Sequence, residues 1–237
     1  MPGKIPSAAA VVVLAGGSGA RLGAAVNKVY LPLAGRRVIS WSLARAREVD
    51  EIGTFVLVVR PGDEQPAAEA LAEDLPGLPV EVVLGGATRH ASEQAALDHL
   101  AGRVAAGAIR VIAIHDGARP LAAPDLFRAV LAAAAEVGGG LPAVPAGSVL
   151  PVDGDTPAVG GGRLVRVQTP QAFRAAELIA AYDAARAAGH SGTHTAGSVQ
   201  AFSDLAVRVV PGSRWNIKIT YPEDLAVAER LISRLPR

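Results

Sequence analysis

The sequence contains no cysteine among its 237 residues, which excludes disulfide bonds, thiolate zinc sites and a cysteine nucleophile. It also lacks a strong charge of either sign, because 23 basic and 22 acidic side chains leave a formal net charge of +1. No basic stripe typical of nucleic-acid binding is visible, and no strong field would draw the chain to an anionic membrane. No apolar run approaches the ~20 residues of a membrane-spanning helix. We therefore expect a cytoplasmic protein without nucleic-acid or membrane partners.

Hydrophobic residues, in contrast, make up 50% of the chain, which is enough for a sizeable core. Lys4 and the apolar stretch behind it faintly imitate a signal peptide. That stretch runs into a glycine-rich loop without a clean cleavage pattern, so we interpret it as the first strand. The length suits one domain of α/β size over residues 1–237.

Short β-branched runs alternate with longer, alanine-rich amphipathic segments. The runs predicted as strands are Ala10–Leu14, Thr54–Val59, Val80–Leu84, Val111–His115, Leu141–Val144 and Val207–Val210. The segments predicted as helices are Val38–Glu48, Pro66–Leu75, Ser92–His99, Pro124–Val137, Arg174–Ala188 and Pro222–Leu235. The strands are almost continuously hydrophobic, which is typical of burial on both faces. The pattern predicts a doubly wound α/β fold with a mostly parallel sheet, whose ligands bind at the carboxyl ends of the strands.

The alternation stops at about residues 145–167, where "PAGSVLPVDGDTPAVGGGRLVRV" is rich in proline and glycine. Its two short alternating apolar pieces predict a β-hairpin or arm that protrudes from the main sheet. At the start of the last helix, Thr220 and Glu223 have the three-residue spacing of a capping box. No internal repeat and no flexible interdomain linker is apparent.

A glycine-rich loop, "LAGGSGARLGAAVNKVYLPL", follows the first strand directly. Gly16, Gly17 and Gly19 allow the backbone to approach a ligand closely, and consecutive N–H groups in such a turn bind phosphate oxygens. Arg21 and Lys28 add positive charge just beyond the glycines. The alternative is a tight strand-to-helix turn that binds nothing.

Two familiar phosphate-binding motifs do not fit this loop. A P-loop needs Gly-Lys-Ser/Thr at the end of the motif, and Lys28 lies outside any such unit. The dinucleotide pattern G-x-G-x-x-G requires glycine where Leu22 stands. No acidic residue ends the strand Thr54–Val59 to hold a ribose; Arg60 and Pro61 follow it instead. The sequence therefore gives little support to a dehydrogenase.

Two further polar clusters follow predicted strands. In "GGATRHASEQAAL" the glycines permit close backbone approach and Arg89 supplies charge, although Ser92 could simply cap a helix. In "IHDGARP" the carboxylate of Asp116 suits a divalent cation or a hydroxyl, and Arg119 follows closely. His115 in the same motif is more easily explained by packing or hydrogen bonding than as a base.

A fourth cluster, "NIKITYPEDL", places Lys218 between isoleucines in what we predict to be a strand. A lysine in that setting is often simply solvent-facing. Four polar clusters at four strand ends of one sheet nevertheless favour a common site. His190 and His194 have the spacing of a helical metal pair, but the flanking Gly189 and Gly192 argue against a helix there.

In this order along the chain, the motifs resemble those of the cytidylyltransferases that make 4-diphosphocytidyl-2-C-methyl-D-erythritol in the non-mevalonate isoprenoid pathway. The resemblance covers nearly the whole chain and includes the close relatives that act on ribitol 5-phosphate. The segments that carry it are "AGGSGARLG", "NKVYLPL", "GGATRHAS", "HDGARP", "QTPQAF" and "NIKIT…PEDL". In the second of these the family usually has Pro-Lys-Gln-Tyr or similar.

The resemblance implies a cytidylyl transfer from CTP to a polyol phosphate, with Mg²⁺ bound to the CTP, a metal contact from Asp116, and a homodimer assembled through the arm. The residues expected to bind the nucleotide are Ala15, Gly16, Gly17, Ser18, Gly19, Gly86, Ala87, Ser92, Asp116 and Gly117. The residues expected to be catalytic are Arg21, Lys28 and Lys218. The residues expected at the acceptor are Arg119, Thr169, Arg163 and Lys218. Such a transfer needs positioning and charge stabilisation rather than a nucleophile and a base.

The departures from the family pattern lie on the acceptor side. The arm has "GSVLP" where the family usually carries Asp-Thr-x-Lys, and "THTAG" replaces an acidic stretch at residues 193–197. The family's acceptor-binding arginine falls near Gly161. Because two residues along a strand return to the same face, Arg163 could replace it; the alternative is that Arg163 and Arg166 are both solvated.

The acceptor that the motif set favours is 2-C-methyl-D-erythritol 4-phosphate. Ribitol 5-phosphate or another alditol phosphate is the main alternative. A nucleotidyltransferase for a different nucleotide fits "GGATRHAS" and "HDGARP" less well. A non-catalytic nucleotide-binding paralogue is the alternative of another class, and the retention of Arg21 and Lys28 argues against it.

Overall fold

The computed structural model describes residues 8–17, 27–147, 152–153, 156–157 and 164–234. A mixed sheet of eight strands has the order β10-β7-β11-β6-β1-β4-β5, and β12 pairs with β7 beside this path. The strands are β1 (Ala9–Leu14), β4 (Ile52–Val59), β5 (Val80–Leu84), β6 (Val111–Asp116), β7 (Gly138–Pro145), β10 (Val165–Val167), β11 (Gln171–Arg174) and β12 (Ala206–Pro211). The pairs β1–β4, β1–β6, β4–β5 and β7–β12 are parallel, whereas β10 and β11 run antiparallel to their neighbours.

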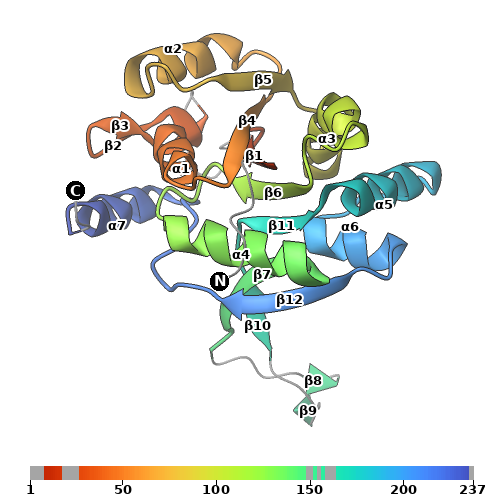
Figure 1. The fold of residues 1–237 in the computed structure, drawn as a ribbon. Helices are drawn as coiled ribbons and strands as arrows, with labels where there is room; N and C mark the ends of the chain where they lie inside the picture. Colours follow the sequence, from red (N-terminus) through yellow and green to blue (C-terminus); the bar gives the residue numbers. More distant parts are fainter. Residues whose placement is uncertain (1–7, 18–26, 148–151, 154–155, 158–163, 235–237) are drawn as a thin grey trace.

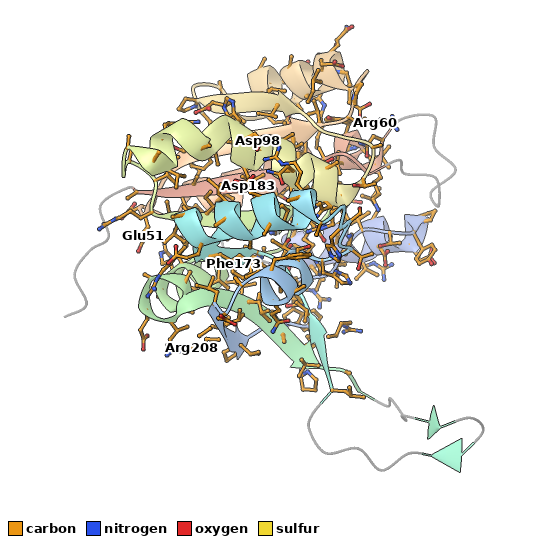
Figure 2. The ribbon with its side chains drawn as sticks, turned by 90° about the vertical axis from the view of Figure 1, so that its right-hand side faces the viewer. Glu51, Arg60, Asp98, Phe173, Asp183 and Arg208 are labelled. Atoms are coloured by element: carbon orange, nitrogen blue, oxygen red, sulfur yellow. The ribbon has the colours of Figure 1, made fainter. Side chains whose placement is uncertain are left out.

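Helices cover both faces of this sheet, and Figure 2 looks onto one of the two helical layers. The helices α1 (Val38–Arg47), α2 (Glu64–Asp74) and α4 (Pro124–Val137) bury side chains in one core. The helices α3 (Arg89–Ala105), α5 (Ala175–Ala187) and α6 (Thr195–Phe202) bury side chains in the other. Figure 1 shows α7 (Pro222–Ile232) beside these layers, close to the small pair β2 (Pro32–Leu33) and β3 (Arg36–Arg37). The predicted doubly wound α/β fold is confirmed.

Strand β1 illustrates why its sequence is apolar throughout. Val11 and Val13 belong to the core on the α1 side, whereas Ala10 and Val12 belong to the core on the α3 side. All four side chains are inaccessible to solvent. A strand between two helical layers needs apolar side chains at every position, because neither face meets water.

The predicted arm is present as the small antiparallel pair β8 (Val152–Asp153) and β9 (Thr156–Pro157). Figure 1 shows this pair standing away from the main sheet. The end of the stretch predicted as arm, residues 165–167, lies in the main sheet as β10, where it pairs with β7.

Some local predictions were wrong or missed an element. Strand β11 and helix α6 were not predicted. Lys218 lies in an irregular segment rather than in a strand. At the start of α7, Asp224 rather than Glu223 closes the first turn, since its carboxylate accepts hydrogen bonds from the backbone N–H groups of Thr220 and Tyr221, both at 2.8 Å. The spacing was correct, but the motif begins one residue later, at Tyr221. None of the described helices is long and apolar enough to cross a membrane.

Candidate active site

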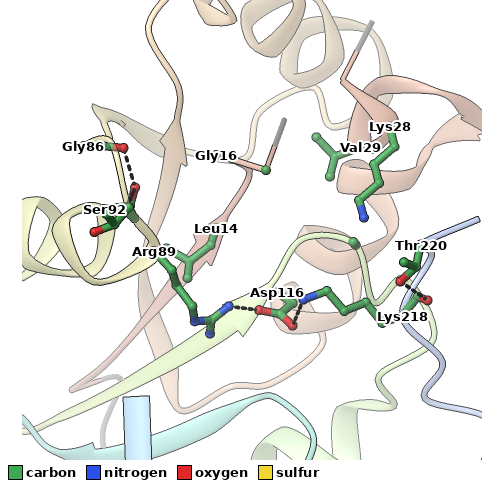
Figure 3. Close-up of a pocket in the computed structure, with 13 residues that line it drawn as sticks. Leu14, Gly16, Lys28, Val29, Gly86, Arg89, Ser92, Asp116, Lys218 and Thr220 are labelled. Carbon is green, nitrogen blue, oxygen red and sulfur yellow. Dashed lines mark hydrogen bonds and ion pairs between the residues drawn. The ribbon is translucent and has the colours of Figure 1, made fainter. Parts of the chain in front are cut away.

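The carboxyl ends of β1, β6 and β5 lie together because these strands are parallel. Leu14 at the end of β1 is in register with Asp116 at the end of β6. The described residues around these ends enclose a pocket of about 310 Å³. The residues that line it are Leu14, Gly16, Gly17, Lys28, Val29, Gly86, Thr88, Arg89, Ser92, Asp116, Ala118, Lys218 and Thr220. Figure 3 shows Lys28 and Lys218 extending toward the same space from different segments.

Asp116 lies at the floor of this pocket, surrounded by cationic side chains. Its Oδ1 forms an ion pair with Nη1 of Arg89, and its Oδ2 lies 3.0 Å from Nζ of Lys218 and 3.5 Å from Nε of Arg119. Burial alone would raise the pKa of this carboxyl group, but attraction to Arg89, Lys218 and Arg119 holds the pKa well below its usual range. Asp116 is therefore ionised, and the cations around it leave an excess of positive charge beside the pocket.

A buried chain of hydrogen bonds supports Asp116 from behind. Its backbone N–H donates to Oγ1 of Thr169 at 3.0 Å, and this hydroxyl lies 3.2 Å from Nδ1 of His115. Nε2 of His115 lies 3.2 Å from the carbonyl oxygen of Arg119, which can only accept, so Nε2 carries the proton. Burial lowers the pKa of His115 to about 4. The expectation that His115 packs and forms hydrogen bonds at its strand end is confirmed.

The segment that carries Lys218 is irregular, yet hydrogen bonds fix it to the body of the molecule. Nη1 of Arg119 donates to the carbonyl oxygen of Asn216 at 2.7 Å, and Nδ2 of Asn216 donates to that of Thr169 at 2.9 Å. The backbone N–H of Ile219 donates to the carbonyl oxygen of Ala118 at 2.8 Å. Lys218 lies between these anchor points, so its backbone is held without the ladder of a sheet.

The start of α3 forms another wall of the pocket. Thr88, and not Ser92, caps the helix, because Oγ1 of Thr88 accepts a hydrogen bond from the backbone N–H of Ala91 at 3.0 Å. The hydroxyl of Ser92 instead donates to the carbonyl oxygens of Thr88 (2.9 Å) and Gly86 (3.3 Å). A Cβ atom at Gly86 would lie 2.5 Å from Cβ of Ala91, so the turn before α3 requires glycine there.

The structure brings many of the predicted site residues together. Those lining the pocket are Gly16, Gly17, Lys28, Gly86, Ser92, Asp116 and Lys218. Those described but not lining it are Ala15, Ala87, Gly117, Arg119 and Thr169. Ser18, Gly19, Arg21 and Arg163 lie outside the described residues. Arg89, expected from the sequence to supply charge in its cluster but not assigned to the nucleotide, the acceptor or catalysis, also lines the pocket.

Gly117 and Thr169 are near the site but are enclosed by protein. A Cβ atom at Gly117 would overlap Cδ1 of Ile39 and lie 2.9 Å from the carbonyl oxygen of Leu14. Thr169 is buried, and its hydroxyl is engaged by Asp116 and His115. Within the described residues, both therefore support the pocket from behind.

The described part of the chain offers little to hold a metal ion by itself. It contains no group of three or more histidine or acidic side chains that could bind one. Asp116 is the only acidic side chain among the described residues lining the pocket, and both of its oxygens already contact cations. A Mg²⁺ ion fits this donor set only if substrate phosphates supply most of its ligands, which is how Mg²⁺ is commonly bound.

A cationic pocket with glycine-lined walls, at the carboxyl edge of a doubly wound sheet, suits the transfer of a nucleotidyl group, and the chain is a nucleotidyltransferase. More closely, it belongs to the family described as IspD, 2-C-methyl-D-erythritol 4-phosphate cytidylyltransferase, whose model matches residues 9–234. The resemblance stated from the motifs is thereby confirmed.

Relatives and solved structures agree over nearly the full chain. A 2-C-methyl-D-erythritol 4-phosphate cytidylyltransferase of Cereibacter sphaeroides is 41% identical over 236 residues, which cover 94% of this chain and 96% of that protein. The Geobacter metallireducens protein of the same name is 38% identical, with 95% and 98% covered. The structure of 4-diphosphocytidyl-2C-methyl-D-erythritol synthase from Anaerococcus prevotii matches with a TM-score of 0.82 and 27% identity, covering 95% of this chain and 98% of that one.

Proposed function

We propose that this enzyme transfers the cytidylyl group of CTP to 2-C-methyl-D-erythritol 4-phosphate. An oxygen of the acceptor phosphate attacks the α-phosphorus of CTP, and the bond from that phosphorus to the bridging oxygen breaks, so that its electron pair leaves with pyrophosphate. The observation that carries the proposal is the family match over residues 9–234, together with a pocket that gathers Lys28 and Lys218.

The attacking phosphate is already anionic, so the reaction needs charge stabilisation more than a base. Lys28 and Lys218 reach the pocket from segments far apart in the sequence, and both extend into it in Figure 3. We assign Lys28 to the α-phosphate and the departing pyrophosphate, and Lys218 to the acceptor phosphate. Arg21 is expected to act with Lys28.

The nucleotide would lie along the glycines at 16, 17 and 86, with the base near Ala87 and Ser92. The hydroxyl hydrogen of Ser92 is engaged in hydrogen bonds to the carbonyl oxygens of Gly86 and Thr88. Its oxygen therefore remains as a hydrogen-bond acceptor, which suits the amino group of cytosine. Mg²⁺, when bound, would neutralise the triphosphate; Asp116 would supply the protein carboxylate, and the phosphates most of the ligands.

The test is pyrophosphate release with each of four nucleoside triphosphates against a panel of polyol phosphates. CTP with 2-C-methyl-D-erythritol 4-phosphate should give the highest kcat/KM. Because a pocket that hydrogen-bonds one base edge leaves polar groups unpaired with another, UTP and ATP should be strongly disfavoured. Preference for ribitol 5-phosphate would establish the alternative acceptor. Release with no pair would favour the non-catalytic paralogue.

A homodimer is also part of the proposal. Apolar side chains on β10, β12 and the residue before β10 are exposed: Leu164, Val165, Val167 and Val209 are between 41% and 57% accessible. They lie near the base of the arm, so a second copy would cover them. Light scattering during size-exclusion chromatography should give twice the mass of the chain. The cytoplasmic location stays a prediction.

A further inference from the structure

The side-chain amide of Asn27 joins the two ends of the glycine-rich segment. Its Nδ2 donates to the carbonyl oxygen of Ala15 at 2.7 Å, across a separation of 12 residues. The same nitrogen donates to Oδ2 of Asp63 at 2.8 Å. Asn27, Ala15 and Asp63 are all at most 5% exposed, so water does not compete for these hydrogen bonds.

Asp63 occupies the N-cap position of α2 but does not cap the helix with its side chain. An aspartate at an N-cap normally accepts a hydrogen bond from the first turn, which stabilises the helix. Here the carboxylate is turned elsewhere: Oδ2 accepts from Asn27, and Oδ1 lies 2.9 Å from Nε of Arg60. Asp63 therefore does not cap α2 with its side chain and instead contacts a segment that is distant in the sequence.

The residues on either side of this junction form two walls of the pocket. Gly16 and Gly17 follow Ala15 directly, and Lys28 and Val29 follow Asn27. Asn27 also begins the short 3-10 helix η2 (Lys28–Tyr30), because its carbonyl oxygen accepts from the backbone N–H of Tyr30 at 3.0 Å. The position of Lys28 relative to Gly16 is therefore fixed through one amide group.

We propose that Asn27 and Asp63 are positioning residues for the transfer reaction, which set the distance between Lys28 and the backbone of Gly16–Gly17. The expected loss of activity rests on the proposed function; the structural role of the two residues does not. Neither side chain lines the pocket, so neither contacts the substrate directly. They act through Lys28, which follows Asn27, and through the carbonyl group of Ala15, which holds the backbone just before Gly16 in place.

Three variants test the proposal. Asn27→Ala removes the donor; Asn27→Asp places a carboxylate against Asp63 and against the carbonyl oxygen of Ala15. The double variant Asn27→Asp/Asp63→Asn moves the amide to the other side of the pair, which restores the hydrogen bond to α2 but not the one to Ala15. The matched control is Asp74→Ala at the far end of α2. The carboxylate of Asp74 accepts three hydrogen bonds, from the backbone N–H of Arg37 (2.8 Å), Nη1 of Arg37 (3.3 Å) and Oγ of Ser40 (2.7 Å).

We expect Asn27→Ala to lower kcat on the order of 10- to 100-fold, as small misplacements of catalytic groups do. Asn27→Asp should lower kcat further, and the double variant should recover part of that loss of kcat. Asp74→Ala should lower Tm without changing kcat or either KM. Unchanged kinetics in Asn27→Ala, or a double variant no better than Asn27→Asp, would overturn the proposal.

Hydrogen–deuterium exchange provides a readout that does not depend on the reaction. Asn27→Ala should speed exchange in peptides covering residues 28–31, while peptides from β4 and β6 stay at the wild-type rate. If the wild-type enzyme releases no pyrophosphate, the proposed function fails and exchange still decides the role of Asn27. Wild-type exchange rates at residues 28–31 in the variant would refute that role even in an active enzyme.

Discussion

Nζ of Lys218 lies 3.0 Å from Oδ2 of Asp116, so an exposed lysine and a buried carboxylate share one wall of the pocket. The lysine is 43% exposed, whereas the aspartate is 8% exposed. Removing the lysine leaves Asp116 paired with Arg89 and Arg119. We therefore expect the contact to contribute little to folding, although it lies close to where an acceptor phosphate would bind.

Lys218→Ala should accordingly lower kcat/KM for the acceptor on the order of 10²-fold, the loss expected for one preorganised charge. Circular dichroism should record a Tm close to that of the wild type. Arg208→Ala is the control, since Arg208 pairs with Glu136 at an exposed surface position. A Tm that falls together with activity in Lys218→Ala would assign the lysine a structural role.

Lys28→Ala should keep its Tm and lose most of its turnover. Lys28 lines the pocket beside Gly16 and Gly17, where the triphosphate is expected. Loss of one charge that stabilises the leaving group should lower kcat on the order of 10²–10³-fold. Steady-state kinetics with CTP measure this, and equal loss of fold and activity would contradict it.

The stability of the protein should fall as the pH drops from about 6.5 toward 4. His115 stays neutral in the folded state until its pKa of about 4, because burial penalises its charged form. The unfolded chain binds that proton already below about pH 6.5, so stability is complete above this pH and decreases below it, by up to about 3 kcal/mol. Urea unfolding at a series of pH values measures the slope. His115→Gln keeps hydrogen-bonding groups but cannot titrate, and its slope should be smaller; an identical slope would assign the loss to other groups.

Gly117→Ala should destabilise the protein, since the added methyl group would overlap Ile39. Overpacking of this kind costs about 1–3 kcal/mol, which corresponds to a fall in Tm of several degrees. Gly197→Ala is the matched control, because the residue is in helix α6 and, apart from its chain neighbours and the nearby backbone of that helix, no atom lies within 4 Å of the added Cβ. An equal Tm for the two variants would show that the structure around Gly117 adjusts to the added methyl group.

Arg163→Ala should raise the KM for the acceptor and lower kcat/KM, while the KM for CTP stays unchanged. This prediction rests on the sequence alone, on the strand-like alternation after Gly161. Unchanged acceptor kinetics would remove Arg163 from the site. Lys218 would then carry the acceptor phosphate with Thr169 supporting it, and an acceptor other than 2-C-methyl-D-erythritol 4-phosphate would become the better choice.

The sequence predicted the elements whose patterns are local. Strand β5 and helix α4 begin and end where the pattern predicted, since their apolar spacing and flanking glycine or proline mark the ends. Strand β11 has only four residues, and it is a strand because β6 and β7 flank it, which no local pattern reveals. Lys218 resembles a strand residue in sequence, but its segment is held by side chains of Arg119 and Asn216 instead of by a ladder.

The site residues also divide into those that a local pattern predicts and those whose place depends on other elements. Gly16, Gly17 and Gly86 were expected to lie together because they follow parallel strands, and they line one pocket. Lys28 and Lys218 reach the same pocket from a short 3-10 helix and an irregular segment. The burial of Thr169 and the enclosure of Gly117 depend on His115 and Ile39, which approach from other elements. Pattern alone does not distinguish a residue that lines a pocket from one that supports it from behind.

The register of β1 against β6 also limits how this chain can change in length. Leu14 pairs with Asp116 at the ends of the two strands, and successive side chains of a strand point to opposite faces. Deletion of one residue between Val111 and His115 would send Asp116 to the face that His115 now occupies and bury its charge away from Arg89 and Lys218. Divergent members of such a lineage can gain or lose residues in surface loops, but within these six positions we expect substitutions without insertions or deletions.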